Sequence, residues 1–256
     1  MSFHILSDIH LELYKSDKDF IKRNQNLFTT RGENLILAGD IGYPFKTKKR
    51  PKIYGLPKTS PIFFNILSEF KKNFKNVIYV SGNHEYYQCV RHNIDMDTVD
   101  NKIREICDEL GILFLQCESI FISGIHVHGC TLFSNVTRED ANMMNDQMRI
   151  TSIEKINTTH KKHLNWLKSL NFRQNELDKE KHIVITHHLP ISYPNLSTGY
   201  YTDILEDIQQ QGPIEYWICG HYHENIYKIR NGTKVVSNPL GYIGEHPSKN
   251  MEIINI

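Results

Sequence analysis

Side chains that can bind metal ions follow five short apolar runs of this 256-residue sequence. Each run is long enough for one buried strand, and each ends in polar residues that include Asp, Asn or His. Carboxylate, amide and imidazole groups together form a mixed oxygen and nitrogen ligand set, which suits divalent Mn, Fe, Zn or Ni. The sequence therefore predicts a divalent metal site. Its candidate ligands are Asp8, His10, Asp40, Asn83, His187, His221 and His223.

Each motif has an ordinary structural explanation when it is considered alone. A D-x-H pair is common in surface turns, a glycine before Asp40 or Asn83 most often makes a turn, and a histidine such as His187 is usually a buried core residue. The H-x-H pair after Gly220 is the strongest single motif. Five strand ends that all carry such residues are improbable by accident, so the set is better evidence than any member.

The strands that position these residues alternate with segments of helical periodicity. We predict strands over residues 3–6, 35–38, 77–80, 183–185 and 216–219, and helices over residues 61–74, 97–110, 152–170 and 202–211. This alternation predicts an α/β sandwich whose ligands bind outside the carboxyl ends of the strands. Gly111 is expected to end the second helix. Residues 226–254 are predicted to form an antiparallel meander with a turn at Asn231-Gly232.

Two long segments lack this pattern, residues 42–60 and residues 134–151. Loops of this length are usually functional or mobile. The basic stretch 46–52 would favour nucleic-acid binding through counterion release. A solvated loop is the preferred interpretation, because basic and aromatic residues do not interleave there as they do in proteins that bind single strands.

Composition favours a single cytoplasmic domain over residues 1–256 that neither spans nor binds a membrane. The 30 Lys and Arg nearly balance the 29 Asp and Glu, so no overall field attracts polyanions. The five cysteines are odd in number and include no C-x-x-C pair, which disfavours a disulfide framework and a zinc ribbon. No secretory signal and no apolar run of roughly 18 residues is present.

The motifs together resemble the signature of the calcineurin-like metallophosphoesterases, which runs D-x-H, G-D, G-N-H, H and G-H-x-H. Residues 8–13, 145–150, 186–190 and 238–242 further resemble a poorly characterised microbial branch. The resemblance implies a four-layer sandwich of two mixed β-sheets flanked by helices, with His84 as the catalytic histidine. It also implies two metal ions, one held by Asp8, His10 and His223 and the other by Asn83, His187 and His221, with Asp40 bridging them.

The sequence departs from the protein Ser/Thr phosphatases of this superfamily, which carry G-D-x-x-D-R-G. Residues 39–45 read GDIGYPF and lack both the second Asp, which orients the catalytic histidine in those enzymes, and the phosphate-binding Arg. Tyr86 stands where those phosphatases have another arginine. The related-looking metallo-β-lactamase motif H-x-H-x-D-H is also missing. A dedicated protein phosphatase is therefore disfavoured.

The predicted function is metal-dependent phosphoester hydrolysis, most simply of a phosphodiester on a small or nucleotide substrate. Two cations, with manganese a leading candidate, would lower the pKa of a bridging water, and the resulting hydroxide would attack phosphorus. His84 would protonate the leaving oxygen. The alternatives are a phosphomonoesterase, a nuclease and an inactive scaffold for protein partners. A scaffold should have lost ligands, and here every ligand of the signature is present.

Further residues are candidates for the substrate side of the site. They are His188, Asn135, Asp146 and Arg149, with Tyr86 and Tyr87 as candidates for stacking on a nucleobase. Structural roles are the preferred interpretation for the first four. The native metals, the leaving group and the oligomeric state leave no signature in the sequence.

Overall fold

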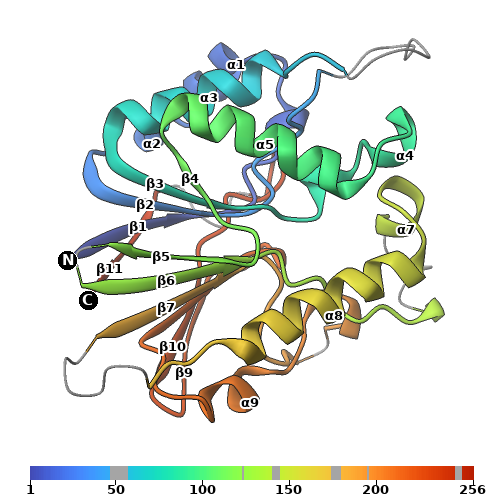
Figure 1. The fold of residues 1–256 in the computed structure, drawn as a ribbon. Helices are drawn as coiled ribbons and strands as arrows, with labels where there is room; N and C mark the ends of the chain where they lie inside the picture. The colour runs from blue at the N-terminus through green and yellow to red at the C-terminus, as the bar shows by residue number, and fades with distance from the viewer. Residues whose placement is uncertain (47–56, 123, 140–144, 174–179, 195, 246–249) are drawn as a thin grey trace.

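Two mixed β-sheets face each other, and helices cover the outer face of each sheet (Figure 1). The computed structural model describes residues 1–46, 57–122, 124–139, 145–173, 180–194, 196–245 and 250–256. The four-layer α/β sandwich expected from the resemblance is confirmed. The basic stretch 46–52 lies outside the described residues except for Lys46.

The first sheet consists of four parallel strands and one antiparallel edge strand. Its strand order is β11 (Glu252–Asn255), β1 (Ser2–Leu6), β2 (Gly32–Ala38), β3 (Phe74–Val80) and β4 (Leu113–Phe114). Strands β1 to β4 run parallel, and β11 is antiparallel to β1. The helices on its outer side are α1 (Asp17–Arg23), α2 (Gln25–Thr29), α3 (Pro61–Asn73) and α5 (Met96–Leu110).

The second sheet has four parallel strands in its middle and one antiparallel strand at each edge. Its order is β5 (Glu118–Ile122), β6 (Ile125–Cys130), β7 (Lys181–Thr186), β8 (Tyr216–Cys219), β10 (Thr233–Ser237) and β9 (Ile226–Arg230). Helices α8 (Ile153–Ser169) and α9 (Leu205–Gln209) cover its outer face. The short elements near the sheet ends are α4 (Cys89–His92), α7 (Asp146–Arg149) and the 3₁₀ turns η1 (Leu11–Leu13), η2 (His84–Tyr86) and η3 (Thr198–Tyr200).

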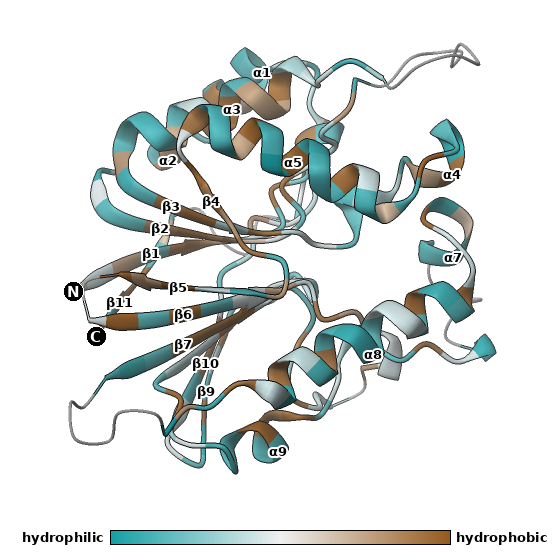
Figure 2. Cartoon of the chain, in the orientation of Figure 1, coloured by the Kyte–Doolittle hydropathy of each residue, from teal (hydrophilic) through white to brown (hydrophobic). Residues whose placement is uncertain are grey.

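Alternating side chains of each central strand fill two different hydrophobic layers. In β2, Ile36 and Ala38 pack between the two sheets, whereas Leu35 and Leu37 pack under the helices. Because both faces of such a strand are buried, the sequence shows a continuous apolar run instead of an alternating one. Figure 2 shows this as brown central strands beneath helices of mixed colour.

Three predicted helices agree with the structure to within one residue at each end, and the fourth shortens to α9. Gly111 ends α5 in the left-handed conformation, with φ at 67°, as expected. Residues 226–230 and 233–237 form the predicted antiparallel hairpin. The meander was wrong, because β11 leaves that sheet and pairs with β1, where Ile254 packs between the sheets.

Several elements were not predicted, namely α1, α2, β4, β5 and β6. In β6 the residues His126 and His128 lie on the outer face and interrupt the apolar pattern. Within the described ranges, every helix is too short or too polar to cross a bilayer.

Candidate metal centre

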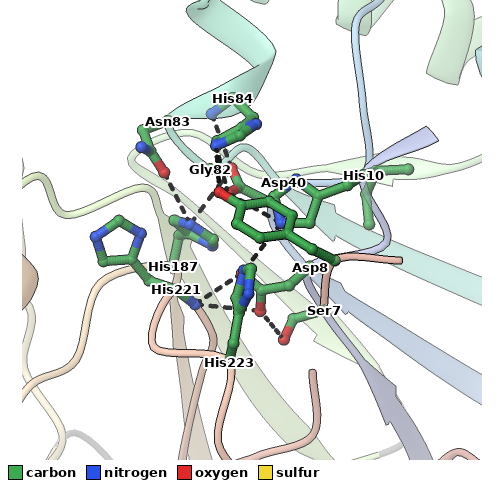
Figure 3. A network of polar contacts seen from close by, with 12 residues as sticks. Ser7, Asp8, His10, Asp40, Gly82, Asn83, His84, His187, His221 and His223 are labelled. Atoms are coloured by element: carbon green, nitrogen blue, oxygen red, sulfur yellow. Dashed lines mark hydrogen bonds and ion pairs between the residues drawn. The ribbon is translucent and has the colours of Figure 1, made fainter. Parts of the chain in front are cut away.

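The carboxyl ends of five strands meet at one edge of the sandwich and bring together all seven predicted ligand residues and His84 (Figure 3). Strands β1, β2 and β3 of the first sheet contribute Asp8 to His84, and β7 and β8 of the second sheet contribute His187 to His223. Parallel strands make this possible, because their carboxyl ends lie at the same edge.

The donor atoms form three overlapping groups in which all atoms lie within 4.8 Å of one another. The groups are Asp8 with His10 and His223, Asp40 with His187 and His221, and His10 with Asp40 and His84. The first group contains the three residues that the resemblance assigned to one metal ion, and the second contains His187, His221 and the proposed bridge Asp40, so the division into two metal sites stays a prediction. Asn83 adjoins the second group, since its Oδ1 lies 3.1 Å from His187 Nε2.

Three histidines direct Nε2 toward the centre because Nδ1 contacts an oxygen behind the ring. These Nδ1 contacts are His10 to Glu12 at 3.2 Å, His187 to the carbonyl of Ala38 at 2.9 Å, and His223 to Glu245 at 2.7 Å. An Nδ1–H donated to such an oxygen leaves the Nε2 lone pair for a metal ion, the usual arrangement of metal-binding histidines.

The donor set fits divalent cations. His10 Nε2 lies only 2.9 Å from His223 Nε2, so two lone pairs converge on one place. His221 Nε2 is buried and has no hydrogen-bond partner among the described residues. A buried polar atom without a partner is costly, and a bound cation would satisfy it.

The backbone at the centre is strained in a systematic way. Five of the seven candidate ligands adopt the left-handed conformation, which is uncommon for residues other than glycine. They are Asp8, His10, Asp40, His221 and His223, with φ between 52° and 73°. Such strain costs about 1 to 3 kcal/mol per residue and clusters at functional sites, where it turns several side chains into one space.

Two glycines of the motifs allow carboxylates to approach the neighbouring backbone. A Cβ atom at Gly82 would lie 2.1 Å from Asp40 Oδ1, and one at Gly220 would lie 2.6 Å from Asp8 Oδ2. The carboxylates use this space for hydrogen bonds, because the backbone N–H of His84 donates to Asp40 at 2.8 Å and that of His221 donates to Asp8 at 2.9 Å.

Glu85 is a completely buried carboxyl group that connects the loops after β2 and β3. It accepts hydrogen bonds from Tyr79 Oη and from the backbone N–H groups of residues 40, 41, 42 and 82, at 2.6 to 3.1 Å. Burial and the nearby charge of Asp40 raise the pKa of Glu85, and the N–H donors oppose them. This group holds Asp40 in place relative to the adjacent strand end.

The charges at the centre depend on one another. Burial favours neutral Asp40, but the nearby His187 and His84 outweigh it and hold the pKa of Asp40 well below its usual range. Burial likewise opposes protonation of His187, and Asp40 raises the pKa of this histidine in spite of it. The carboxylate therefore stays ionised and available as a ligand.

The side-chain amide of Asn83 is oriented by two hydrogen bonds. Its Nδ2 donates to Asp146 Oδ1 at 2.9 Å and to Tyr87 Oη at 3.0 Å, so its oxygen faces His187. Asp146, a candidate for the substrate side, therefore lies beside Asn83 and in the lining of the pocket over the centre.

The other substrate-side candidates lie in different places. His188 is buried with its ring 4.1 Å from that of His221, and Asn135 is exposed on the surface. The Arg149 guanidinium lies over the Tyr87 ring at 5.3 Å. Tyr86 is fully buried and donates to Asp100, so it does not face the site.

His84 is held on several sides. Its Nδ1 donates to Glu12 Oε1 at 2.7 Å, the Tyr87 ring stacks on it with centroids 4.0 Å apart, and its Nε2 lies 3.4 Å from Tyr242 Oη. Burial lowers the pKa of His84. The charges of Asp40 and Glu12 raise this pKa by more than burial lowers it, so the net shift is upward.

Glu12 is the residue that sequence reasoning missed. Burial raises its pKa, but hydrogen bonds from His10 and His84 outweigh this and lower it to about 2. Its carboxylate therefore lies beside His84, where the sequence offered no aspartate after Asp40. Its place two residues after His10, following the D-x-H motif, was the available signal.

A pocket of about 450 Å³ lies over the centre. Its wall includes Asp40, His84, His221 and His223, together with the rings of Tyr87, Tyr200 and Tyr242. The metal-binding groups are thus open on one side to a small ligand.

Comparison with known proteins gives consistent results. The family model described as calcineurin-like phosphoesterase matches residues 1–225. The uncharacterized protein L509 of Acanthamoeba polyphaga mimivirus is 28% identical over an alignment of 283 positions. The alignment covers 96% of this chain and 92% of that protein.

Two solved structures share the fold. The phosphopantetheinyl hydrolase of Mycobacterium tuberculosis has a TM-score of 0.67 at 17% identity, with 95% of this chain and 90% of that chain covered. A dimetal phosphatase from Danio rerio has a TM-score of 0.54 at 9% identity, with 93% and 86% covered.

Proposed function

Since this chain belongs to the calcineurin-like phosphoesterase family, we propose that it hydrolyses small phosphodiesters, nucleotide-type diesters included, at a centre of two divalent cations. Family membership makes the chain a metal-dependent phosphoester hydrolase, and its His and Asp groups could bind the metals. The number of cations, the ligand assignment and the substrate are the proposal.

One observation carries the dinuclear assignment, the position of Asp40 between two groups of ligands. Its Oδ2 lies 3.9 Å from His10 Nε2, and its Oδ1 lies 3.4 Å from His187 Nε2. A carboxylate placed in this way can bind one cation with each oxygen. One cation would be held by Asp8, His10 and His223 and the other by Asn83, His187 and His221, with Asp40 shared.

When bound, the two cations supply a water of lowered pKa and offset the charge that builds on the phosphoryl oxygens. The chain supplies the proton for the leaving group. His84 Nε2 faces the pocket, and its Nδ1–H is held by Glu12, so a protonated His84 can donate from Nε2 to the leaving oxygen. General acids of this kind contribute roughly 10² to 10⁴ in rate.

The described pocket lining supports a diester over a monoester, because it offers no Lys or Arg beside the proposed cations. It includes the carboxyl groups of Asp146 and Glu245 besides Asp40, and among these described residues there is no Lys or Arg. A diester phosphate carries one negative charge, whereas a monoester near neutral pH carries almost two. Besides the proposed cations, no Lys or Arg of the described lining is available to balance the second charge of a monoester.

The proposal is tested by hydrolysis of bis-p-nitrophenyl phosphate against p-nitrophenyl phosphate. The protein is stripped of metal, and Mn²⁺, Ni²⁺, Zn²⁺ or Mg²⁺ is added back. Asp40→Asn is compared with Asp108→Asn, which changes an exposed carboxylate near the C-terminal end of α5. We expect metal to restore diester cleavage in the wild type and in Asp108→Asn, and Asp40→Asn to retain less of both metals.

Each failure points to a different alternative. A preference for the monoester would support a phosphomonoesterase. Salt-sensitive cleavage of DNA or RNA would support a nuclease. If no metal restores cleavage of either ester, the inactive scaffold becomes the better explanation, and full metal content in Asp40→Asn would show that the bridge is assigned wrongly.

A further inference from the structure

Cys117 and Cys130 face each other at the ends of two neighbouring strands. The antiparallel ladder of β5 and β6 ends with Glu118 opposite Gly129, and Cys117 and Cys130 are the residues just beyond this pair. Cys117 has a φ of 57°, so it leaves the strand conformation and does not continue the ladder. A disulfide needs a Cα spacing of about 4.4 to 6.8 Å, so the departure of Cys117 from the ladder means that bond formation must shift the chain there.

The surrounding contacts bring the two side chains together. Cys117 packs against the hydrophobic cluster that contains Cys130. The side chain of Gln116, next to Cys117, donates to Thr131 Oγ1 and accepts from the Thr131 backbone N–H, each at 2.9 Å, next to Cys130. Cys130 is fully buried, whereas Cys117 is partly exposed. An oxidant can therefore reach one sulfur while the other waits beside it.

The surroundings make Cys117 the more reactive thiol. The hydrogen bond from Cys130 lowers the pKa of Cys117, and the neighbouring His163 and Lys162 add to this effect. Burial raises the pKa of Cys130. Because the thiolate is the reactive form, Cys117 is suited to attack and Cys130 to follow. Burial raises the pKa of the remaining cysteines, Cys89, Cys107 and Cys219.

We propose that Cys117 and Cys130 are a thiol pair that a peroxide oxidises to a reversible disulfide, and that this disulfide loosens the neighbouring metal centre. The Cys117 thiolate attacks a peroxide oxygen and becomes a sulfenic acid, while the O–O bond breaks and the other oxygen leaves as water or an alcohol. The Cys130 sulfur then displaces the sulfenic hydroxyl as a second water. The peroxide is reduced by two electrons, and the pair loses two hydrogens.

The residues next to the cysteines connect the pair to the centre. Gln116 Oε1 accepts from the backbone N–H of Thr131 at 2.9 Å, and Gln116 Nε2 donates to Tyr86 Oη at 2.6 Å. The Thr131 carbonyl in turn accepts the backbone N–H groups of His187 and His188 at 3.0 and 3.2 Å.

Formation of the disulfide must move the neighbouring residues Gln116 and Thr131, which are hydrogen-bonded to each other. The two sulfur atoms would come to about 2.05 Å from each other, which draws the ends of β5 and β6 together. Since the Thr131 carbonyl supports the backbone of His187, the shift reaches a candidate ligand. We expect activity to fall by about tenfold, because displacements of roughly 1 Å can cost up to about 10² in rate. The metal-loosening part of this inference rests on the proposed function.

The test uses the full chain, reduced and loaded with Mn²⁺, and titrated with hydrogen peroxide. Free thiols are alkylated, and peptide mapping by mass spectrometry identifies any disulfide. Bound metal is counted after gel filtration, and diester hydrolysis is measured in parallel. Cys117→Ser and Cys130→Ser are compared with Cys89→Ser, which removes a buried thiol from the same chain.

We expect a Cys117–Cys130 disulfide in the wild type and in Cys89→Ser, with loss of bound Mn²⁺ that dithiothreitol and fresh metal reverse. Cys117→Ser should keep its metal, and Cys130→Ser should accumulate a sulfenic acid at Cys117. Both thiols still alkylated after peroxide, or a disulfide with unchanged metal content, would overturn the proposal. The peptide maps and the metal counts need no substrate. A protein that forms the disulfide and loses metal but cleaves no diester would therefore contradict the proposed diesterase activity and leave the thiol pair supported.

Discussion

At the centre, individual side chains depend on particular partners for their orientation. Glu12 contacts His10 and His84, Asp146 orients the amide of Asn83, and Glu245 contacts His223. Removing such a partner leaves the ligand in place but frees its rotation. Losses of about 10- to 100-fold in metal affinity or activity are typical of such changes.

Glu12→Gln tests whether this carboxylate acts through His84. The neutral amide holds the imidazole less well, so we expect kcat to fall by about 10-fold or more, with a smaller change in KM. His84→Asn should lower kcat by roughly 10² to 10⁴. Bound metal is counted in each variant, because Glu12 also contacts His10.

The double variant decides between the two roles. If Glu12 positions His84, Glu12→Gln adds little to His84→Asn, because the group that it orients is already gone. Fully multiplied losses would show that Glu12 acts independently of His84.

The elements are joined at the site by loops that hold one another. Glu85 connects the loop after β2 to the loop after β3, and the Thr131 carbonyl connects the end of β6 to the start of the loop after β7. The strand ends therefore keep their relative positions through polar contacts as well as through the apolar layers.

Glu85→Ala should destabilise the fold more than an ordinary surface change. Four backbone N–H groups and Tyr79 Oη lose their buried acceptor. Unsatisfied buried donors cost about 1 to 3 kcal/mol each before relaxation or entry of water, so we expect a loss of roughly 3 kcal/mol in unfolding free energy. Urea denaturation measures it against the exposed control Glu109→Ala. Equal stability of the two variants would contradict this role of Glu85.

The outer face of β6 and β7 predicts a dependence of stability on pH. Burial and the neighbouring His182 and His126 lower the pKa of His128 to about 3, and Ser119 and Phe172 also contact its ring. The folded state thus keeps His128 neutral while the unfolded chain protonates it below its ordinary pKa near 6.5. Stability is therefore lost as pH falls from about 6.5 toward 3.

His128→Gln should reduce this loss. One such group contributes at most about 1.4 kcal/mol per pH unit, so the variant should show a flatter curve of unfolding free energy between about pH 6 and pH 4. Urea denaturation at several pH values provides the measurement. Parallel curves for the variant and the wild type would rule out His128 as a source.

For the molecule as a whole, the metal centre and the apolar layer between the sheets both span the two sheets. The ligands come from strands of both sheets, and the termini meet where Met1 and Ile256 exchange backbone hydrogen bonds of 2.7 and 2.9 Å. We therefore propose that residues 1–256 form one cooperative domain.

Calorimetry tests this proposal. We expect one unfolding transition that Mn²⁺ moves to higher temperature, because ligand at about 100 times its Kd adds roughly 2.7 kcal/mol of stability. Asp40→Asn should show a smaller shift. Two separate transitions, of which only one responds to metal, would contradict a single domain.

Residue types and spacing were sufficient to predict the sandwich and to identify the residues that meet at its edge. The reason is local, since an apolar run followed by Asp or His marks a strand end, and parallel strands bring such ends together. The partner of β11, the contact of Glu12 with His84 and the approach of Cys117 to Cys130 were decided by the tertiary structure. These contacts join segments whose separate sequences carry no sign of one another, so the order and pairing of the strands within each sheet determine them.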